Sequence, residues 1–510
     1  MIKNHLLTIT LFLPVFGAAF LLFIDKEKEK LIKNSALAFS LITFLLSLPL
    51  FFLFPAGDAG FSFAEKYSWI KPLGIHYSVG IDGLSLMMTL LTTFLMPICV
   101  LSSYDYIKTG IKQYYAWLLF LETGIIGVFV SLDVFLFYVF WEAMLIPMYF
   151  LIGVWGGERR IYATLKFFIY TMAGSLFMLV AILILFYAGK QQHGIYSFDL
   201  LDFYKVTLTG KLALFSFLAF LAAFAVKVPI FPFHTWLPDA HVEAPTAGSV
   251  ILAGVLLKMG IYGYLRFLVP IFPELSVEYA PWIAGFGVIG VIYASLVAWA
   301  QKDIKKLIAY SSIAHLGLVI LGVMSFTPEA VSGGILQMVN HGLSTGALFL
   351  LAGILYERRH TRHIASYGGL FKSVPHFAAV FMVAALSSIA LPGLNGFVGE
   401  FMIFAGSFGK FPLLTSVAIS GVILSAVYML SMYEKVFYGE LSIKENENIP
   451  DLKTREWLYL LPILFFIVFI GLKPQPFLDK LESSARNYIS AAQKGEAMGG
   501  RQEAEEENRK

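Results

Sequence analysis

The stretch AVKVPIFP (225–232) ends an apolar run, 212–233, in which Lys227 precedes two prolines. The run has about the 20 residues that a helix needs to cross a bilayer, but proline removes a backbone donor and breaks the helix. A similar break, ALPGLNG (390–396), interrupts the run 377–408. Broken helices at matching positions in two halves of a chain indicate the ion path of a transporter. The two stretches therefore predict a membrane protein built from two similar halves.

The composition of the whole chain agrees with a membrane setting. The 510 residues are 58% hydrophobic and 14% charged, with a mean hydropathy of +0.75. A soluble domain cannot hide that much apolar side chain beneath a polar surface, whereas a bilayer accepts it. Runs of near-bilayer length lie at 6–24, 35–54, 84–103, 115–130, 134–153, 165–188, 212–233, 249–269, 281–300, 307–325, 330–355, 377–408, 414–433 and 456–472. We expect an all-α polytopic membrane protein of about 14 transmembrane helices, with the seventh and twelfth broken.

The spacing of the breaks predicts the organisation of the chain. They lie five spans apart, which favours two inverted five-helix repeats. We expect transmembrane helices 1–3 in residues 1–110, the repeats in 111–270 and 281–440, a last helix in 441–472 and a tail in 473–510. The first run is long for a signal peptide and precedes charged residues rather than a cleavage site, so we expect it to be retained. The tail predicts a short amphipathic piece followed by a disordered end.

Loop charge predicts the orientation. Loops after odd-numbered spans hold most of the loop Lys and Arg, including Lys302, Arg358 and Arg362, and the other loops hold fewer, such as Lys66 and Lys71. The positive-inside rule places the first set in the cytoplasm. We expect a multi-pass protein of the bacterial inner (plasma) membrane with both termini periplasmic.

The chain has few residues suited to a cofactor. Cys99 is the only cysteine, and a lone thiol cannot build an iron–sulfur cluster or a structural zinc site. No GxGxxG follows a strand pattern, and no GxxxxGK(S/T) occurs. The net charge of +3 leaves a nucleic-acid partner without support. We therefore expect neither a cofactor nor a metal in this chain.

Four charged residues lie in the middle of predicted spans: Glu142, Lys227, Lys258 and Glu400. Each such charge costs ~2.5–3.5 kcal/mol on translocon scales, so several in one chain need a reason. One reason is structural pairing alone, because two acids balance two bases. The other reason is ion transfer. Burial disfavours the charged form of a side chain, whereas a nearby opposite charge favours it, so the side chain can exchange a proton when its partner moves. We favour transfer.

Other polar residues in the spans allow plainer interpretations. His315 and His341 can bridge proton-exchanging sites, but a lone histidine is often a hydrogen-bonded core residue. Long cations near helix ends usually extend to the interface, and Asp133 can be a helix cap. The cations of this kind are Lys166, Arg266 and Lys410.

Longer motifs make the chain similar to a known family. They are WE (141–142) with Pro147, PFHTWLPDAHVEAP (232–245), QKDIKKLIAYSSIAHLG (301–317), NHGLSTGALF (340–349) and LPGLNGFVGEF (391–401). Together they resemble the antiporter-like subunits of respiratory complex I, NADH-quinone oxidoreductase. In the last motif the siblings and the related cation/proton antiporter subunits usually carry lysine where this chain has Glu400.

The resemblance implies a proton channel in a membrane arm, driven by quinone reduction elsewhere in the complex. It implies that Glu142 and Lys227 interact, that Lys258 is the central relay, and that Glu400 is the far site. The linking histidines would be His234, His315 and His341. It also implies partners: other membrane-arm subunits, including sibling antiporter-like subunits, and the lipid bilayer. NAD, flavin, iron–sulfur clusters and quinone would reside in partner subunits.

Two other functions stay open at the level of the sequence. One is a subunit of a multi-chain sodium/proton antiporter, against which Glu400 argues, or of a membrane-bound hydrogenase. The other is a passive membrane scaffold, which would leave Glu142 and Lys227 without a role. The roles of Glu122 and Asp303 remain open as well.

Overall fold

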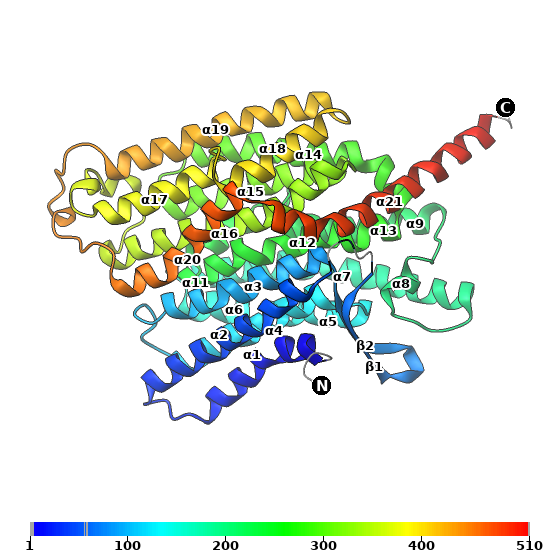
Figure 1. Cartoon of the computed structure of the whole chain (residues 1–510), viewed down its shortest axis with the longest axis horizontal. Helices are drawn as coiled ribbons and strands as arrows, with labels where there is room; N and C mark the ends of the chain where they lie inside the picture. The colour runs from blue at the N-terminus through cyan, green and yellow to red at the C-terminus, as the bar shows by residue number, and fades with distance from the viewer. Residues whose placement is uncertain (1–4, 56, 58–59, 508–510) are drawn as a thin grey trace.

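The computed structural model describes residues 5–55, 57 and 60–507, and it forms an elongated bundle of helices (Figure 1). Before the first break the helices are α1 (Leu6–Phe23), α2 (Glu29–Leu53), α3 (Gly83–Ser102), α4 (Ile111–Val130), α5 (Val134–Ala143), α6 (Leu145–Trp155), α7 (Arg160–His193), α8 (Leu200–Phe203) and α9 (Gly210–Lys227). Between α2 and α3, β1 (Ser62–Ile70) and β2 (Ile75–Ile81) form an antiparallel hairpin, joined by a 3-10 turn, Lys71–Leu73. The sequence analysis did not predict this hairpin.

The second part of the chain completes the bundle. Its helices are α10 (Trp236–Glu243), α11 (Thr246–Ile251), α12 (Leu257–Gly263), α13 (Val269–Ile271), α14 (Pro273–Trp299), α15 (Ile304–Met324), α16 (Pro328–Arg359), α17 (Pro375–Ser388), α18 (Asn395–Phe408), α19 (Pro412–Phe437), α20 (Thr454–Leu472) and α21 (Gln475–Glu507). Short 3-10 turns lie in the connections at Ile364–Ser366, Leu370–Lys372 and Lys444–Asn446.

The number of membrane crossings agrees with the prediction. Thirteen helices within the described residues are long and apolar enough to cross a bilayer, counting α5–α6 and α11–α13 as one helix each. The shorter helices α17 and α18 flank the second break, in the run predicted as the twelfth span, and are not in this count. The prediction of an all-α polytopic membrane fold is confirmed.

Both predicted breaks are present. After α9 the chain leaves the helical path for residues 228–235, which contain Pro229 and Pro232, before α10 begins. Between α17 and α18 it does so for residues 389–394, which contain Pro392. Each break therefore falls where proline removes a helical hydrogen bond.

The eighth crossing has an irregularity that the sequence did not indicate. Between α11 and α12 lies a π-helical segment, η3 (Leu252–Leu256), and between α12 and α13 lies another, η4 (Tyr264–Leu268). Single π-helical turns inside helices often mark functional sites. The short α12 that they enclose carries Lys258.

The C-terminal tail corrects the prediction of a short piece with a disordered end. It forms one continuous helix, α21, which runs along the bundle and packs against α14, α16 and α3 (Figure 1). The Tyr488 hydroxyl donates to the Val323 carbonyl at 3.1 Å, and the Lys480 ammonium donates to the Phe54 carbonyl at 2.5 Å. Because these contacts are tertiary, the polar composition of the tail could not reveal them.

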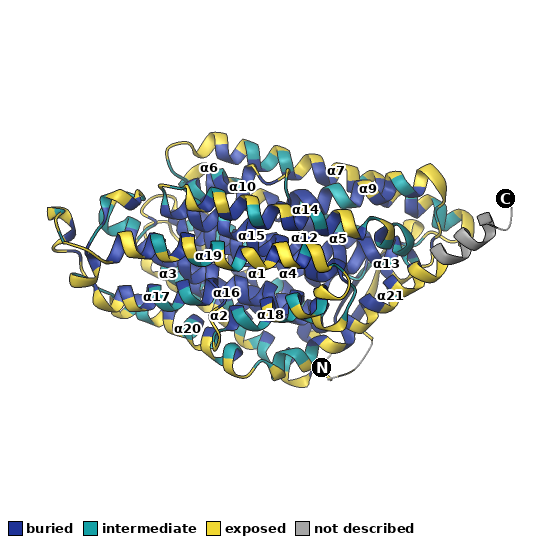
Figure 2. Cartoon of the chain, turned by 90° about the horizontal axis from the view of Figure 1, so that it is seen from above, coloured by how far each residue is buried: buried dark blue, intermediate teal, exposed yellow. Residues whose placement is uncertain are grey.

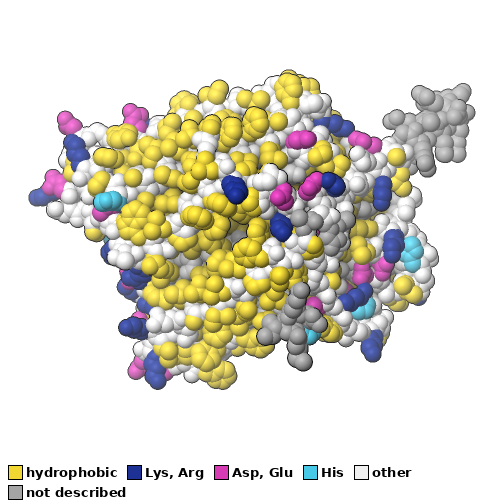
Figure 3. Space-filling view, viewed as in Figure 1, with side chains coloured by type: hydrophobic (Ala, Val, Ile, Leu, Met, Phe, Trp, Pro, Cys, Tyr) yellow, Lys and Arg dark blue, Asp and Glu magenta, His cyan; other side chains and the backbone are white. Residues whose placement is uncertain are grey.

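Burial separates the inner helices from the outer ones (Figure 2). The eighth crossing and α16 are buried along their most apolar stretches, whereas α2, α7 and α19 expose apolar side chains such as Phe52, Leu176 and Ile423. On the face in Figure 3, apolar side chains cover the middle and most charged side chains gather toward the two ends of the bundle. This distribution of apolar and charged side chains is typical of a bundle surrounded by lipid or by similar helices. We call the end of the bundle that carries β1, β2 and α8 the hairpin end.

Candidate functional site

Lys258 begins a set of buried polar contacts in the middle of the bundle. Its side chain is fully buried, and its ammonium donates to the Ala253 carbonyl within η3. The same nitrogen lies 2.7 Å from Nδ1 of His341, which belongs to α16. Lys258 and His341 are therefore in direct contact.

The contacts continue from His341 to Glu400. The rings of His341 and His315 lie 5.7 Å apart between centroids. Nδ1 of His315 lies 2.9 Å from Oε1 of Glu400, and Nε2 of His315 lies 3.5 Å from the hydroxyl of Ser388. All four ionisable side chains are buried. We call this set the polar line: Lys258, His341, His315 and Glu400.

The second break holds the end of the polar line in place. Gln337 donates from Nε2 to Oε1 of Glu400 at 3.1 Å, so this oxygen has two partners. Asn340 donates to the Asn395 carbonyl at 2.8 Å, and Ser387 donates to the Asn395 side chain at 2.6 Å. These bonds satisfy backbone and side-chain groups that a broken helix leaves exposed to a medium without water.

Gln337 and Asn340 were missed by the sequence analysis. A signal was available, because α16 carries polar residues at helical spacing: Gln337, Asn340, His341, Ser344 and Thr345. Spacings of three, four, seven and eight residues place them on one face of a helix. Such a stripe in a helix that is buried all round points to polar partners from neighbouring helices.

A small cavity adjoins Glu400. Its volume is about 20 Å³, and its lining includes Ser295, His315, Glu400, Ser425 and Tyr428. A volume of this size, with several polar groups around it, suits about one water molecule. The carboxyl group of Glu400 therefore has room for a small polar neighbour such as water.

Glu142 and Lys227 interact without direct contact. Within the described residues no ion pair joins them at 4.0 Å or less; instead, the Lys227 ammonium lies 3.7 Å from the Met144 sulfur and 5.2 Å from the centre of the Trp141 ring. The two charges still interact through space. One carboxylate oxygen of Glu142 is buried with no hydrogen-bond partner in the described part of the chain. The interaction is therefore electrostatic rather than a contact.

His234 lies in the first break and outside the polar line. Its side chain is buried, and its ring lies 5.1 Å from Tyr293 and 5.7 Å from Phe231 between centroids. Its Nδ1 has no hydrogen-bond partner among the residues described. The structure therefore places His234 beside aromatic rings and not beside Lys258.

The cations that were expected to reach the interface behave differently from one another. Lys166 forms an ion pair with Asp239 at 2.7 Å, and Lys410 forms one with Glu496 at 2.9 Å; both pairs are partly exposed. Arg266 is buried and bound to Asp82 at 2.6 Å, so the expectation that it extends to the interface is wrong.

Asp133 is a helix cap. Its Oδ1 accepts the backbone N–H groups of Phe135 and Leu136, and its Oδ2 accepts the N–H of His76 in β2. Burial raises the pKa of Asp133 to about 7, against the opposing effect of these three N–H groups and with a further contribution from Asp199. Asp133 therefore joins the hairpin to the start of α5.

The two residues left open by the sequence have contrasting surroundings. Asp303 caps α15 by accepting the Lys306 N–H, and it pairs with Arg362 at 3.2 Å. Glu122 is fully buried in α4, and neither carboxylate oxygen has a hydrogen-bond partner among the residues described.

His241 is a further buried histidine to which the sequence analysis gave no role. Its ring stacks on Phe349 at 4.6 Å with an interplanar angle of 8°. Neither ring nitrogen has a hydrogen-bond partner in the described residues, although Lys258 and Lys305 both act on it electrostatically. The signal was its place in the quoted motif 232–245.

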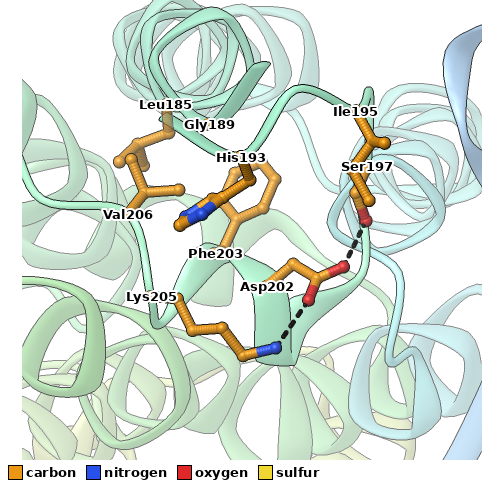
Figure 4. Close-up of a pocket in the computed structure, with 9 residues that line it drawn as sticks. All are labelled: Leu185, Gly189, His193, Ile195, Ser197, Asp202, Phe203, Lys205 and Val206. Carbon is orange, nitrogen blue, oxygen red and sulfur yellow. Dashed lines mark hydrogen bonds and ion pairs between the residues drawn. The ribbon is translucent and has the colours of Figure 1, made fainter. Parts of the chain in front are cut away.

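A separate pocket of about 220 Å³ lies at the hairpin end, between the end of α7 and α8 (Figure 4). In it Lys205 and Ser197 both reach the carboxylate of Asp202, at 2.9 Å and 2.8 Å. Burial acts to raise the pKa of Asp202, but these two partners lower it below its usual value. The pocket shares no residue with the polar line.

The described residues contain no group of three or more His, Cys, Asp or Glu side chains arranged to hold a metal ion. The expectation that cofactors reside in other chains stays a prediction.

Comparison with known proteins places the chain in a family. The family described as NADH:quinone oxidoreductase/Mrp antiporter, transmembrane, matches residues 131–469. NADH-quinone oxidoreductase subunit M of Rickettsia conorii is 44% identical over 498 residues, which cover 96% of this chain and 99% of that one. The respiratory complex I structure from Thermus thermophilus contains a chain that is 33% identical, with a TM-score of 0.87 over 95% of this chain and 99% of that chain.

A chain of the Mrp complex from Dietzia shares the fold, with a TM-score of 0.83, 20% identity, and coverage of 96% of this chain and 99% of that one. At this identity the likeness concerns the fold alone. The subunit M likeness extends over nearly the full length of both chains, with the breaks and the polar line inside the matched region. The chain thus belongs to the NADH:quinone oxidoreductase/Mrp antiporter transmembrane family.

Proposed function

We propose that the chain is the proton-translocating membrane-arm subunit of NADH-quinone oxidoreductase that corresponds to subunit M. The observation that carries the proposal is the polar line, in which buried acid and base side chains follow one another across four crossings. The similarity to subunit M over nearly the full chain supports the same function. Partners are the other membrane-arm subunits, including sibling antiporter-like chains, and the lipid bilayer.

Each step of the proposed transfer uses a named atom. The Lys258 ammonium gives a proton to Nδ1 of His341, 2.7 Å away. His341 releases a proton from its Nε2, which has no other hydrogen-bond partner among the described residues, toward His315. His315 takes it at Nε2, beside Ser388, and releases one from Nδ1 to Oε1 of Glu400. Imidazole suits this relay because it can take a proton at one nitrogen and release one at the other.

The first half supplies the control of this transfer. Lys227 and Glu142 act on each other through space, so a change in the distance between them changes the stability of the charged form of each side chain. In this proposal the pair responds to neighbouring subunits, and the polar line carries the proton. Redox chemistry takes place in partner chains, which hold the NAD, flavin, iron–sulfur clusters and quinone; this chain contains no redox centre.

The organisation and orientation belong to the same proposal. Two inverted five-helix repeats, 111–270 and 281–440, place one break in each half, and both termini face the periplasm of a bacterial inner membrane. A reporter fused to the C-terminus should read periplasmic, and one inserted at Arg358 to Arg362 should read cytoplasmic. Two cytoplasmic readings would refute this orientation.

The test of the proposed function is proton uptake by membrane vesicles during NADH oxidation, in a complex that carries His315→Ala. We expect the complex to assemble and to lose proton transfer through this chain. A second variant, Ser416→Ala, serves as the control, since Ser416 is exposed on α19 and donates only to the Pro412 carbonyl. An assembled His315→Ala complex with the proton stoichiometry of the wild type would refute the proposal.

A further inference from the structure

A large cavity at the hairpin end reaches the eighth crossing at Arg266. Its volume is about 610 Å³, and it lies between α8, η4 and α21. Exposed residues, Leu201, Lys494 and Met498, form its rim. The buried side chains of Asp82 and Arg266 also line it, so they form its floor.

The floor of this cavity is an ion pair. Nη2 of Arg266 lies 2.6 Å from Oδ1 of Asp82, and each side chain is 9% exposed. Ser85 supports both partners: its N–H donates to Asp82 at 3.0 Å, and its hydroxyl accepts from Arg266 at 3.3 Å. Burial acts to raise the pKa of Asp82, but the Arg266 guanidinium holds it below its usual value. Both groups are therefore charged.

Tyr262 lies on the same crossing between Arg266 and Lys258, four residues from each. Nε of Arg266 donates to the Tyr262 hydroxyl at 3.2 Å, and that hydroxyl donates to the Phe129 carbonyl at 3.0 Å. Lys258 lies four residues before Tyr262, about one helical turn deeper. The residues 258, 262 and 266 thus lead from the polar line to the cavity floor.

We propose that the Arg266–Asp82 ion pair closes the hairpin end of the eighth crossing to protons, so that a proton on Lys258 leaves toward His341. This inference rests on the proposed function of the polar line. A fixed guanidinium repels protons and other cations, as positive groups do in selective pores. Asp82 holds the guanidinium at the floor, and η4 brings Arg266 under the cavity.

A purely structural role makes a different prediction. The pair also joins the start of α3 to η4, and removal of either partner alone would leave a buried charge without its counter-ion. The informative variant therefore removes both charges together and keeps hydrogen-bonding groups: Asp82→Asn with Arg266→Gln. If the pair is only structural, this variant loosens the fold without opening a path that depends on Lys258.

The experiment measures passive proton leak in liposomes that contain the whole purified complex. A potassium diffusion potential drives protons in the absence of NADH, and an enclosed pH dye reports the flux. We expect leak roughly tenfold faster than in the wild type for the neutral double variant. Arg266→Lys, which keeps a positive charge, should leak as slowly as the wild type. Addition of Lys258→Ala to the double variant should restore the slow rate.

Lys410→Gln is the matched control, because it removes an exposed ion pair with α21 at Glu496 and leaves the cavity floor intact. Assembly is checked on a native gel. An unchanged leak in the assembled double variant, or a fast leak that persists with Lys258→Ala, overturns the inference. The leak is measured without turnover, so this result is independent of whether His315→Ala abolishes pumping.

Discussion

The two breaks surround their charges differently. Near the second break, Glu400 has two hydrogen-bonding partners on one oxygen, His315 and Gln337. Near the first break, Lys227 rests against the sulfur of Met144 and the ring of Trp141, and Glu142 acts on it from a distance. One charge is therefore fixed by geometry, whereas the other depends on a separation that can change. We infer that the polar line transfers protons and that the Glu142–Lys227 pair controls when it does so.

The largest expected effect comes from the fixed charge. Glu400→Gln removes the proton-accepting group at the end of the polar line but keeps its shape. We expect proton transfer through this chain to fall by about a hundredfold, the lower end of what a positioned acid or base contributes. The measurement is proton uptake by vesicles alongside NADH oxidation. An assembled Glu400→Gln complex with wild-type uptake would mean that the contact with His315 serves structure only.

A smaller effect is expected from the distant pair. Glu142→Gln or Lys227→Ala should slow coupled proton uptake by about tenfold, because each change removes one through-space interaction but leaves the polar line intact. Glu142→Asp should retain part of the uptake, since it keeps the negative charge. If either charge-removing variant matched Glu400→Gln, the distinction between a transferring polar line and a controlling Glu142–Lys227 pair would fail.

Gln337 tests how far geometry fixes Glu400. Gln337→Leu removes one donor to the carboxylate, and a hydrogen bond to a charged group contributes about 1.5–3 kcal/mol. We expect proton uptake to fall less than with Glu400→Gln, while Gln337→Glu should be more harmful because it places a second carboxyl beside the first. Equal uptake in the wild type and Gln337→Leu would show that His315 alone positions Glu400.

Asp133 gives a prediction for pH and stability. Its pKa is about 7 in the folded chain and near 3.8 when unfolded. At pH values between these two, the folded state therefore binds more protons than the unfolded state. Stability should therefore decrease as pH rises from about 4 to 7, and Asp133→Asn should flatten this part of the profile. Thermal unfolding of the purified complex at several pH values measures it. A profile with the same slope in both proteins would contradict the assignment.

The smallest effect is expected at Lys166. Its ion pair with Asp239 is partly exposed, and such pairs contribute about 0–1 kcal/mol. Lys166→Ala should therefore leave proton uptake within about twofold of the wild type. A loss as large as that of Lys227→Ala would mean that Lys166 acts together with the Glu142–Lys227 pair.

The sequence predicted what depends on local pattern. Apolar run length predicts the crossings, and Pro229 and Pro392 predict the breaks, because both follow from backbone hydrogen bonding. The resemblance assigned Lys258, His315, His341 and Glu400 to one path, and the structure brings these four together. Their contacts depend on helix packing between segments up to 85 residues apart, which no local pattern specifies.

What the sequence missed also has physical reasons. The Arg266–Asp82 pair joins residues from crossings that are far apart in the sequence. The sequence alone could therefore not distinguish a paired, buried Arg266 from a cation near a helix end that reaches the interface. The hairpin and the helical tail are stabilised by tertiary contacts, such as that of Tyr488 with the Val323 carbonyl. The separation of Glu142 from Lys227 depends on the packing of Met144 and Trp141 between helices, which composition does not reveal.

The position of the polar line within its crossings has an energetic consequence. His341 and His315 lie near the middle of their helices, Lys258 lies near the middle of the crossing 246–271, and Glu400 lies just past the second break. A proton that moves between them travels mainly parallel to the bilayer, and such a path does almost no electrical work. Crossing the full membrane potential requires about 2.3 kcal/mol per 100 mV for each charge. Nearly all of that work must be done in the two short segments that join the ends of the line to the aqueous phases.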